Sequence, residues 1–443
     1  MRIRVQKFKS GERYVFLVGE DGVPDFWVTH YVTQRLRMTK AQRTIVQYLR
    51  DIKHFRRWEL LNGRDVIEEI SNGKVLSLND IDSLKEHCAY QVEALMEKPI
   101  GKVTDMGKFY LSKAKDKPTV SQRQYKTRVK RVADFLHVIG QERVKSKPLA
   151  AKLFEELEQM KKRLIDGLPK TRLNRPYVDR TGITDGAFED FVAVSKPDSE
   201  YNPFKEPVVR LRNYLIIRIF YETGLRCSEL LALRISDIGT ETDSPKLVIE
   251  RRHDSKDDPR SIEPTAKTLG REVFISKGLR DLLYSYVKRQ RRLTNGAKKH
   301  PFIFVTHKEK KGSYQTGEPL TNRTISNVFK CLRGVNPERF AYITSHAYRH
   351  FFNDRLSAHI DEMNKMTREQ VNRLELEGRT EEAKQLANEN TVTEQRELEI
   401  RAELNGHSAL SSGQYYLKRT AKKNATSIRE KMHDLLKHKI EGS

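Results

Sequence analysis

The chain has 443 residues, of which 37% are hydrophobic, and its 84 Lys and Arg against 60 Asp and Glu give a formal net charge of +24. This length predicts two or three folded domains. No uncharged apolar run is long enough to span a membrane, the first residues lack the apolar core of a secretory signal, and three dispersed cysteines exclude a disulfide framework and a Cys-based zinc site. The excess positive charge favours a polyanionic partner, most often nucleic acid, with ribosome or anionic lipid as alternatives.

The first 30 residues contain two runs of alternating apolar and polar side chains, separated by the polar stretch Lys9–Glu12. This pattern predicts an N-terminal arm over residues 1–30 in the form of a β hairpin. Helices follow. In Lys40–Leu60 and in Thr119–Gly140 the apolar residues recur every three or four positions, which is typical of a helix with one buried face. We therefore expect residues 31–165 to form a helical domain.

The second of these helices carries a basic stripe. Between Gly101 and Lys147 there are 13 basic and 4 acidic residues, and Arg123, Lys126 and Lys130 fall on one side of a helix. A solvated helix face would explain such a stripe in isolation. In a chain of this net charge, contact with a phosphate backbone is the better interpretation, so these three residues are the predicted DNA contacts.

A linker is predicted over residues 166–185. This segment contains four helix breakers: Gly167, Pro169, Pro176 and Gly182. The sequence after it, residues 186–443, is expected to form a second domain that is mixed but mostly helical. Its predicted elements are a helix over Pro207–Glu222, a helix over Ser228–Arg234, strands in LVIE and REVFIS, a basic helix over Leu279–Arg292, and further helices to the end.

Residues 361–400 differ from their surroundings, because they contain 11 acidic and 6 basic residues in a run whose one glycine is Gly378. This composition predicts two charged helices hinged at Gly378. A net charge of −5 makes contact with DNA unfavourable, so we expect a helical hairpin that contacts protein. A passive surface hairpin is the alternative. The apolar residues available to pack the two arms together are Met363, Met366, Leu374, Leu386 and Val392.

The stretch YETGLRCSELLALRISDI places Gly224 at a helix break and Arg226 just after it, where a turn can aim a guanidinium into a cleft. Glu229 lies three residues further, on the same helical face, and is predicted to orient Arg226 as a supporting residue. Taken alone, an Arg after a Gly at a helix start is usually structural.

Two further segments contain residues suited to phosphate chemistry. SHAYRH places His346 and Arg349 three residues apart on one helical face. LNGHSALSSGQYY offers His407 after a glycine and Tyr416 nine residues later, with Tyr415 beside it. Neighbouring helical residues point about 100° apart, so the two tyrosines cannot both face one phosphate.

In this order, the segments resemble the tyrosine recombinase (phage integrase) family. TGLRCSELLAL is similar to its first arginine box, SHAYRH to its His-x-x-Arg box, and NGHSALSSGQYY to its Gly-His segment, whose spacing selects Tyr416 as the nucleophile. KTLGREVFI is similar to the hairpin that carries the family's lysine, which points to Lys267, with Lys256 as the alternative. The 58 positions from Arg349 to His407 are about twice the family's usual spacing, because the acidic segment lies there.

The resemblance implies a fold that is mostly α with small β elements: a helical core-binding domain over 31–165, and a mixed α/β catalytic domain over 186–443. TIVQYLRDIKHFRRW is similar to the first helix of the family's core-binding domain. A C-terminal helix is expected over 417–440, docked in cis or on a neighbouring protomer. The resemblance also implies assembly into a tetramer on two double-stranded DNA sites, a place on a mobile genetic element, and a cytoplasmic, nucleoid-associated location.

The implied reaction is cutting and rejoining of DNA through a 3′-phosphotyrosyl intermediate. Arg226 and Arg349 would each donate forked hydrogen bonds to the phosphate, His346 would accept the proton of Tyr416, and Lys267 would protonate the expelled 5′ oxygen. The remaining histidine, His407, would hydrogen-bond a phosphate oxygen. Because the covalent intermediate keeps the energy of the phosphodiester, no ATP is expected.

No cofactor or metal site is expected, since His300, His307 and His350 join no metal-binding spacing. Two alternatives use the same scaffold. A type IB topoisomerase-like enzyme or hairpin-forming resolvase would share the chemistry without pairing two sites. A non-catalytic DNA-binding protein is disfavoured by the complete set of six catalytic candidates, since a protein that only binds DNA needs no nucleophile.

Overall fold

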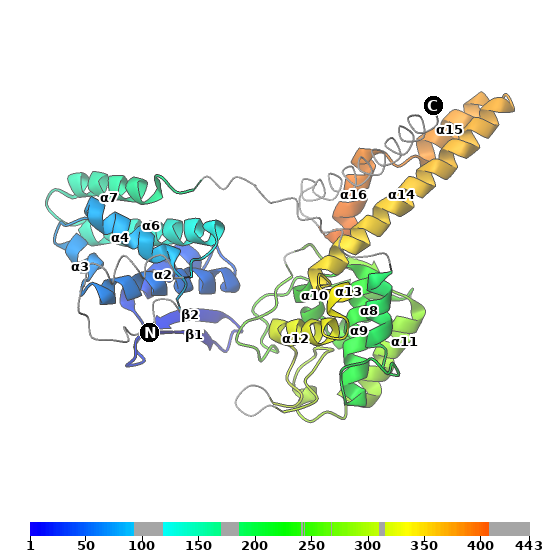
Figure 1. Ribbon diagram of the computed structural model, residues 1–443, viewed down its shortest axis with the longest axis horizontal. Coiled ribbons are helices and arrows are strands. Elements are labelled where there is room, and N and C mark those ends of the chain that lie inside the picture. The colour runs from blue at the N-terminus through cyan, green and yellow to red at the C-terminus, as the bar shows by residue number, and fades with distance from the viewer. Residues whose placement is uncertain are drawn as a thin grey trace, which may run out of the picture. The chain divides into compact units, whose positions relative to one another are not determined.

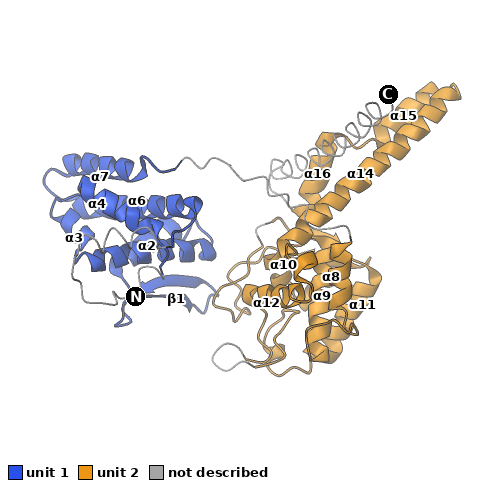
Figure 2. Ribbon diagram, viewed as in Figure 1, with its two compact units in different colours: residues 1–178 blue, residues 179–443 orange. Residues whose placement is uncertain are grey.

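The computed structural model describes residues 1–92, 118–169, 186–240, 242, 244–266, 268–309 and 315–406. It divides the chain into two compact units, Met1–Val178 and Asp179–Ser443 (Figure 2). The boundary between the units falls inside the segment for which the sequence predicts a linker. In the described part of the chain, no helix has the length and apolar character needed to cross a membrane.

Unit 1 begins with a β hairpin, in the region where alternation predicts one. Strands β1 (Arg2–Lys7) and β2 (Arg13–Val18) pair antiparallel, with Arg2 opposite Val18. Strand β1 alternates exposed and half-buried residues, whereas β2 is almost wholly buried. The hairpin therefore packs through β2 on the helices and is part of the core of unit 1.

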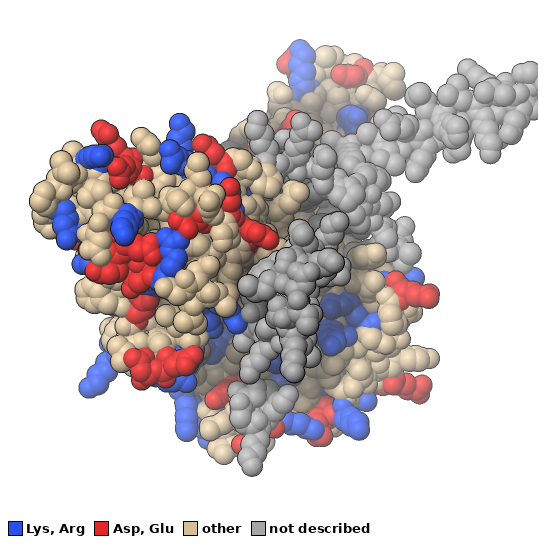
Figure 3. Space-filling view, turned by 60° about the vertical axis from the view of Figure 1, so that its left-hand side comes forward, with Lys and Arg blue, Asp and Glu red and all other residues tan. Residues whose placement is uncertain are grey.

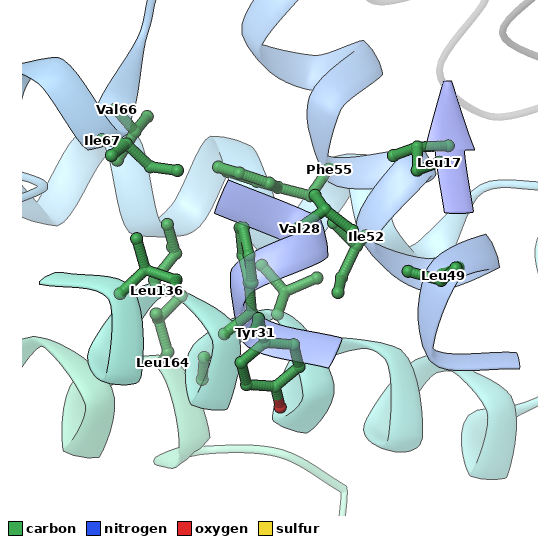
Figure 4. Close-up of a cluster of buried hydrophobic side chains, with 14 of the residues drawn as sticks. Leu17, Val28, Tyr31, Leu49, Ile52, Phe55, Val66, Ile67, Leu136 and Leu164 are labelled. Carbon is green, nitrogen blue, oxygen red and sulfur yellow. The ribbon is translucent and has the colours of Figure 1, made fainter. Parts of the chain in front are cut away.

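The rest of unit 1 is helical. Its described helical elements are α1 (Phe26–Tyr31), the π-helical turn η1 (Val32–Leu36), α2 (Gln42–Leu61), α3 (Val66–Ser71), α4 (Leu78–Ala89), α6 (Gln122–Val144) and α7 (Ala150–Ile165). The apolar stripes read from the sequence point inward: Leu49, Ile52 and Phe55 of α2 and Leu136 of α6 are fully buried. Figure 4 shows them in one cluster with Leu17 of β2.

Ionic groups also hold α2 to α6 in unit 1. The carboxylate of Asp51 on α2 accepts a hydrogen bond from Arg131 at 2.7 Å and lies 3.6 Å from the guanidinium of Arg128, both on α6. Burial raises the pKa of Asp51, and the two arginines offset this only in part. Arg128 also donates to the main-chain oxygen of Cys88 at 2.7 Å, which ties α6 to the end of α4.

Unit 2 is built around α9, whose apolar residues Leu215, Ile216, Ile217, Ile219 and Phe220 are fully buried. The described elements ahead of residue 341 are α8 (Ala187–Ser195), α9 (Pro207–Thr223), α10 (Cys227–Ala232), η3 (Ile235–Asp237), β3 (Lys246–Ile249), β4 (Arg271–Phe274), α11 (Lys277–Ser285), η4 (Tyr286–Arg291), η5 (Ala297–Lys299), α12 (Asn322–Arg333) and α13 (Pro337–Phe340). Strands β3 and β4 pair antiparallel, with Ile249 opposite Arg271. The predicted fold class, mostly α with small β elements, is confirmed.

Three helices complete the described part of unit 2: α14 (Ser345–Leu376), α15 (Thr380–Asn390) and α16 (Glu394–Asn405). Helix α14 starts in the SHAYRH segment and runs without a break into the acidic segment. Gly378 then turns the chain with φ +75°, and α15 folds back along α14, so that both extend away from the rest of unit 2 (Figure 1). The amide side chain of Asn364 pairs with the backbone of Val392 in both directions, at 2.8 and 3.0 Å, and closes this hairpin at its base.

The packing of the hairpin differs from the sequence expectation. Met363 and Met366 are 42% and 54% exposed, whereas Leu374, Leu386 and Val392 are half-buried. The buried positions of the two arms are small side chains, Thr367 of α14 and Ala383 of α15.

Candidate active site

The first element of the site is the turn between α9 and α10, which carries Arg226. Helix α9 ends at Gly224 with φ +60°, and a Cβ there would lie 2.7 Å from Cβ of Phe352 on α14. Glycine is therefore required both for the backbone conformation and for the contact with α14. Arg226 follows immediately ahead of α10, and its side chain is 33% exposed.

Glu229 lies beneath this turn and joins it to the hairpin of β3 and β4. Its carboxylate accepts hydrogen bonds from the backbone N–H of Arg226 at 2.9 Å, from Oγ1 of Thr268 at 2.6 Å and from Arg271 at 3.1 Å. The guanidinium of Arg226 is 3.4 Å away. Burial acts to raise the pKa of Glu229, but the charge of Arg271 and these hydrogen bonds outweigh it, so the pKa lies below its ordinary value. Glu229 is therefore an ionised, fully buried support.

Arg349 is placed by the first turns of α14. The Thr344 hydroxyl caps this helix by accepting from the backbone N–H of Ala347 at 3.1 Å. Arg349 is only 2% exposed, and its guanidinium donates to the main-chain oxygens of Gly224 and Asn405, both at 3.1 Å. Arg226 donates to the same Asn405 oxygen at 3.4 Å. The two predicted arginines, 123 positions apart in the sequence, thus meet at one oxygen atom.

His346 lies on the same helix but on its exposed side. Its Nε2 is 3.1 Å from Nε2 of His350, one turn further along α14. The HxxR spacing therefore gives an inward arginine and an outward histidine. Tyr348, between them, is fully buried against Phe188 and Phe220 and fixes the orientation of the turn.

The residues that follow the predicted lysine contact the residues that precede His407. Arg271 donates to the oxygen of Leu404 at 3.0 Å, and the backbone N–H of Leu269 donates to the oxygen of Gly406 at 3.1 Å. Gly406 ends α16 with φ +63°, and a Cβ there would lie 2.8 Å from Arg271 and 2.9 Å from Thr268. Residues 268 and 406 are thus held together.

Lys267, His407, Tyr416 and Tyr415 themselves lie outside the described residues. Their predicted roles stay predictions. The alternative lysine, Lys256, is described and exposed.

The sequence analysis did not identify three residues that support the site: Thr268, Arg271 and Asn405. The alternation of REVFI identified the strand that contains Arg271 but gave no sign that Glu229 is its partner. Position alone offered a signal, since Thr268 and Arg271 follow the predicted lysine and Asn405 precedes the Gly-His pair.

The predicted DNA contacts lie in unit 1, on α6. Arg123 and Lys130 are exposed, whereas Lys126 is half-buried, with Nζ 3.5 Å from the oxygen of Pro169. In the left-hand part of Figure 3, Lys and Arg side chains are interspersed with Asp and Glu side chains. Contact of this stripe with DNA stays a prediction.

Comparison with known proteins identifies a domain in unit 2. The model of the Phage integrase family matches residues 202–367. A comparison with the curated proteins finds no match. The resemblance to this family is confirmed for residues 202–367, and so is the predicted enzyme class, a tyrosine-type site-specific DNA recombinase.

Solved structures similar to the chain are also recombinases. They include XerA recombinase (14% identity, covering 91% of this chain and 98% of that one, TM-score 0.33) and XerH bound to palindromic difH substrate in a post-cleavage complex (15%, 82% and 94%, 0.39). A third is the Tn1549 transposon integrase in complex with transposon right end DNA (14%, 91% and 98%, 0.42).

Proposed function

We propose that this chain cuts and rejoins double-stranded DNA at specific sites through a 3′-phosphotyrosyl intermediate on Tyr416. The observation that supports this most is the meeting of Arg226 and Arg349 at one main-chain oxygen. Two guanidiniums at one point create a site for an anion, and forked donors suit the non-bridging oxygens of a phosphodiester. The charge that builds up on those oxygens in the transition state is what such donors stabilise.

The remaining roles follow the chemistry of the side chains. Tyr416 attacks phosphorus and loses its proton to the neutral imidazole of His346, while the 5′ oxygen leaves with a proton from Lys267. His407 hydrogen-bonds a phosphate oxygen. A second DNA end reverses the step, because the phosphotyrosine keeps the energy of the bond that was broken. Neither a metal ion nor ATP takes part.

In this proposal the two units have different roles. Residues 31–165 form the core-binding domain that holds the duplex, partly through Arg123, Lys126 and Lys130, and residues 186–443 form the catalytic domain. Four protomers assemble on two DNA sites, with the acidic segment 361–400 in contact with protein. The net charge of +24 supports the duplex as partner. A role in moving a genetic element, in the cytoplasm and on the nucleoid, belongs to the same proposal.

The decisive experiment uses a nicked DNA substrate that traps the covalent adduct. Tyr416→Phe removes only the phenolic oxygen, so DNA affinity should be unchanged and the adduct should disappear. Tyr415→Phe is the matched control and should react at close to the normal rate. The adduct should also form in EDTA. An adduct in the Tyr416→Phe variant, or a strict need for Mg²⁺, would disprove the proposed mechanism, and failure to join two paired sites would favour the topoisomerase-like alternative.

A further inference from the structure

A layer of buried polar residues lies between α14 and α16. Arg401 of α16 is fully buried, Asn353 and Asn405 are each 1% exposed, and Ser357 is 3% exposed. Two helices of a globular domain usually meet through apolar side chains. Here the contact nearest the two-arginine site is polar.

Arg401 is the centre of this layer. Its guanidinium donates to Oδ1 of Asn353 at 3.0 Å, to the hydroxyl of Ser357, and to the carboxylate of Glu397 at 2.6 and 2.9 Å. Asn405 extends the layer by donating to the same Oδ1 of Asn353 at 2.9 Å. Asn353 in turn donates to the main-chain oxygen of Arg349 at 2.7 Å. A continuous set of hydrogen bonds therefore runs from Arg401 to the catalytic turn of α14.

Such a layer allows only one register of α16 on α14. A buried guanidinium without its partners is strongly destabilising, since its desolvation is then uncompensated. A shift of α16 by one turn would separate Arg401 from Asn353 and Ser357. An apolar seam would tolerate such a shift far better, because apolar contacts are not directional.

The register matters because α16 ends at the site. Asn405 is the last residue of α16, and its main-chain oxygen is the atom that both Arg226 and Arg349 contact. Gly406 follows, enclosed by Thr268 and Arg271, and the next residue is His407. A displacement of α16 would therefore move the common acceptor of the two arginines and the start of the segment that carries the nucleophile.

We infer that Arg401 is a positioning residue for the recombination reaction. It fixes the register of α16 on α14, and through the Asn405 oxygen it sets the orientation of Arg226 and Arg349 toward the scissile phosphate. This inference rests on the proposed function. It also assigns a purpose to part of the acidic segment, because Glu397, the acidic partner of Arg401, belongs to residues 361–400.

The test compares Arg401→Met with Arg396→Met. Arg396 lies on the same helix and is exposed, so its replacement controls for the loss of a positive charge from α16. Each full-length variant is mixed with the nicked substrate, and the single-turnover rate of adduct formation is measured beside the Kd for the same DNA. We expect Arg401→Met to lower the rate by up to about 100-fold, because a misplacement of the reacting groups by about 1 Å can cost that much. Its Kd and the rate of the Arg396→Met control should be unchanged.

Two further variants separate positioning from general damage. Arg401→Lys keeps the charge and one donor, so it should recover part of the rate. The double variant Arg349→Lys with Arg401→Met should be slowed by less than the product of the two single reductions, because part of the effect of Arg401→Met passes through Arg349. If Arg401→Met unfolds the chain, Glu397→Gln provides the milder disruption of the same layer and should slow the adduct rate at unchanged Kd.

A normal adduct rate in both Arg401→Met and Glu397→Gln would overturn the inference, and so would a double variant slowed by the full product of the two single reductions. These outcomes differ from failure of the proposed function, in which the unmodified chain itself would form no adduct on any substrate.

Discussion

Asp51 in unit 1 and Glu229 in unit 2 are both buried carboxylates that face two arginines, yet their pKa values shift in opposite directions. Burial dominates at Asp51 and raises its pKa, whereas the pKa of Glu229 is lowered despite its burial. The difference lies in the other donors: Glu229 also accepts from a threonine hydroxyl and from the backbone N–H of Arg226. A carboxylate with donors of several kinds is ionised and fixed in position.

The two carboxylates also serve different structures. Asp51 joins two neighbouring helices of one core. Glu229 joins the turn of Arg226 to the hairpin that follows Lys267, and so brings together residues from distant parts of the chain. We therefore predict that replacing Glu229 or its partners changes the rate of the reaction. Replacing Asp51 or its partners should change only the stability of the fold.

Arginine replacements should give the largest contrast. Arg226→Lys or Arg349→Lys should slow adduct formation by about 100-fold or more, because a point charge cannot reproduce forked hydrogen bonds to a phosphate. Arg131→Lys, beside Asp51, should leave the rate on saturating DNA unchanged. Single-turnover rates and Kd values on one substrate measure both. Equal reductions in the adduct rate for the Arg131→Lys variant and for the Arg226→Lys or Arg349→Lys variants would contradict this prediction.

The carboxylates themselves give the next contrast. Glu229→Gln should slow adduct formation by roughly 10- to 100-fold, whereas Asp51→Asn should not. Because the pKa of folded Glu229 is lowered, its stabilisation is present above the ordinary carboxyl pKa and is lost as the pH falls through the folded value. Because the pKa of folded Asp51 is raised, its contribution is present at acid pH and is lost as the pH rises through the folded value.

Urea unfolding at neutral and at acid pH checks these signs. Glu229→Gln should reduce the free energy of unfolding more at neutral pH than at acid pH, and Asp51→Asn should do the reverse. The same pH dependence in both variants would contradict the comparison.

A smaller effect is expected on the outer face of α6, the helix whose inner face holds the partners of Asp51. Charge reversal at Arg123, Lys126 and Lys130 should weaken DNA binding and flatten its salt dependence by about 0.9 in log–log slope for each phosphate that these side chains no longer neutralise. The adduct rate at saturating DNA should be unchanged. Kd values over a range of salt concentrations test this, and an unchanged slope would show that the stripe faces solvent.

The smallest effect on single-site chemistry is expected far from both carboxylates. Replacing residues 366–390 with a short Gly/Ser loop removes the outer hairpin but keeps the pairing of Asn364 with Val392 and the whole of α16. Binding and adduct formation at one site should be normal, while recombination between two sites should fall. Full recombination by the shortened protein would show that the hairpin makes no required contact.

Local spacing allowed much of the site to be predicted. Arg226 and Glu229 lie three residues apart at a helix start, and the structure joins them as expected. His346 and Arg349 lie within one turn of α14, but they do not share one face, because Arg349 is buried and His346 is exposed. Gly378 predicted the turn between the two charged helices, because glycine readily adopts the positive φ found there.

The contacts made across long distances were not predictable in the same way. The partner of Arg271 is Glu229 on α10, 42 positions earlier in the chain, and nothing near Arg271 in the sequence indicates this contact between β4 and α10. Arg401 and Asn353 lie in polar stretches, where the composition favours exposure. They are buried because α16 folds onto α14, and this contact depends on the three-dimensional arrangement rather than on any local pattern.

Helix α14 has 32 residues and no internal proline or glycine, which gives an unbroken rod of about 48 Å at 1.5 Å per residue. One end of this rod contains Arg349, and the other lies at the tip of the hairpin. Because this helix has no flexible point along its length, a force on the tip of the hairpin tilts the whole helix. The bending moment is largest at the end that contains Arg349. A partner bound at the tip would therefore be connected to the site of Arg226 and Arg349 through the backbone of one helix.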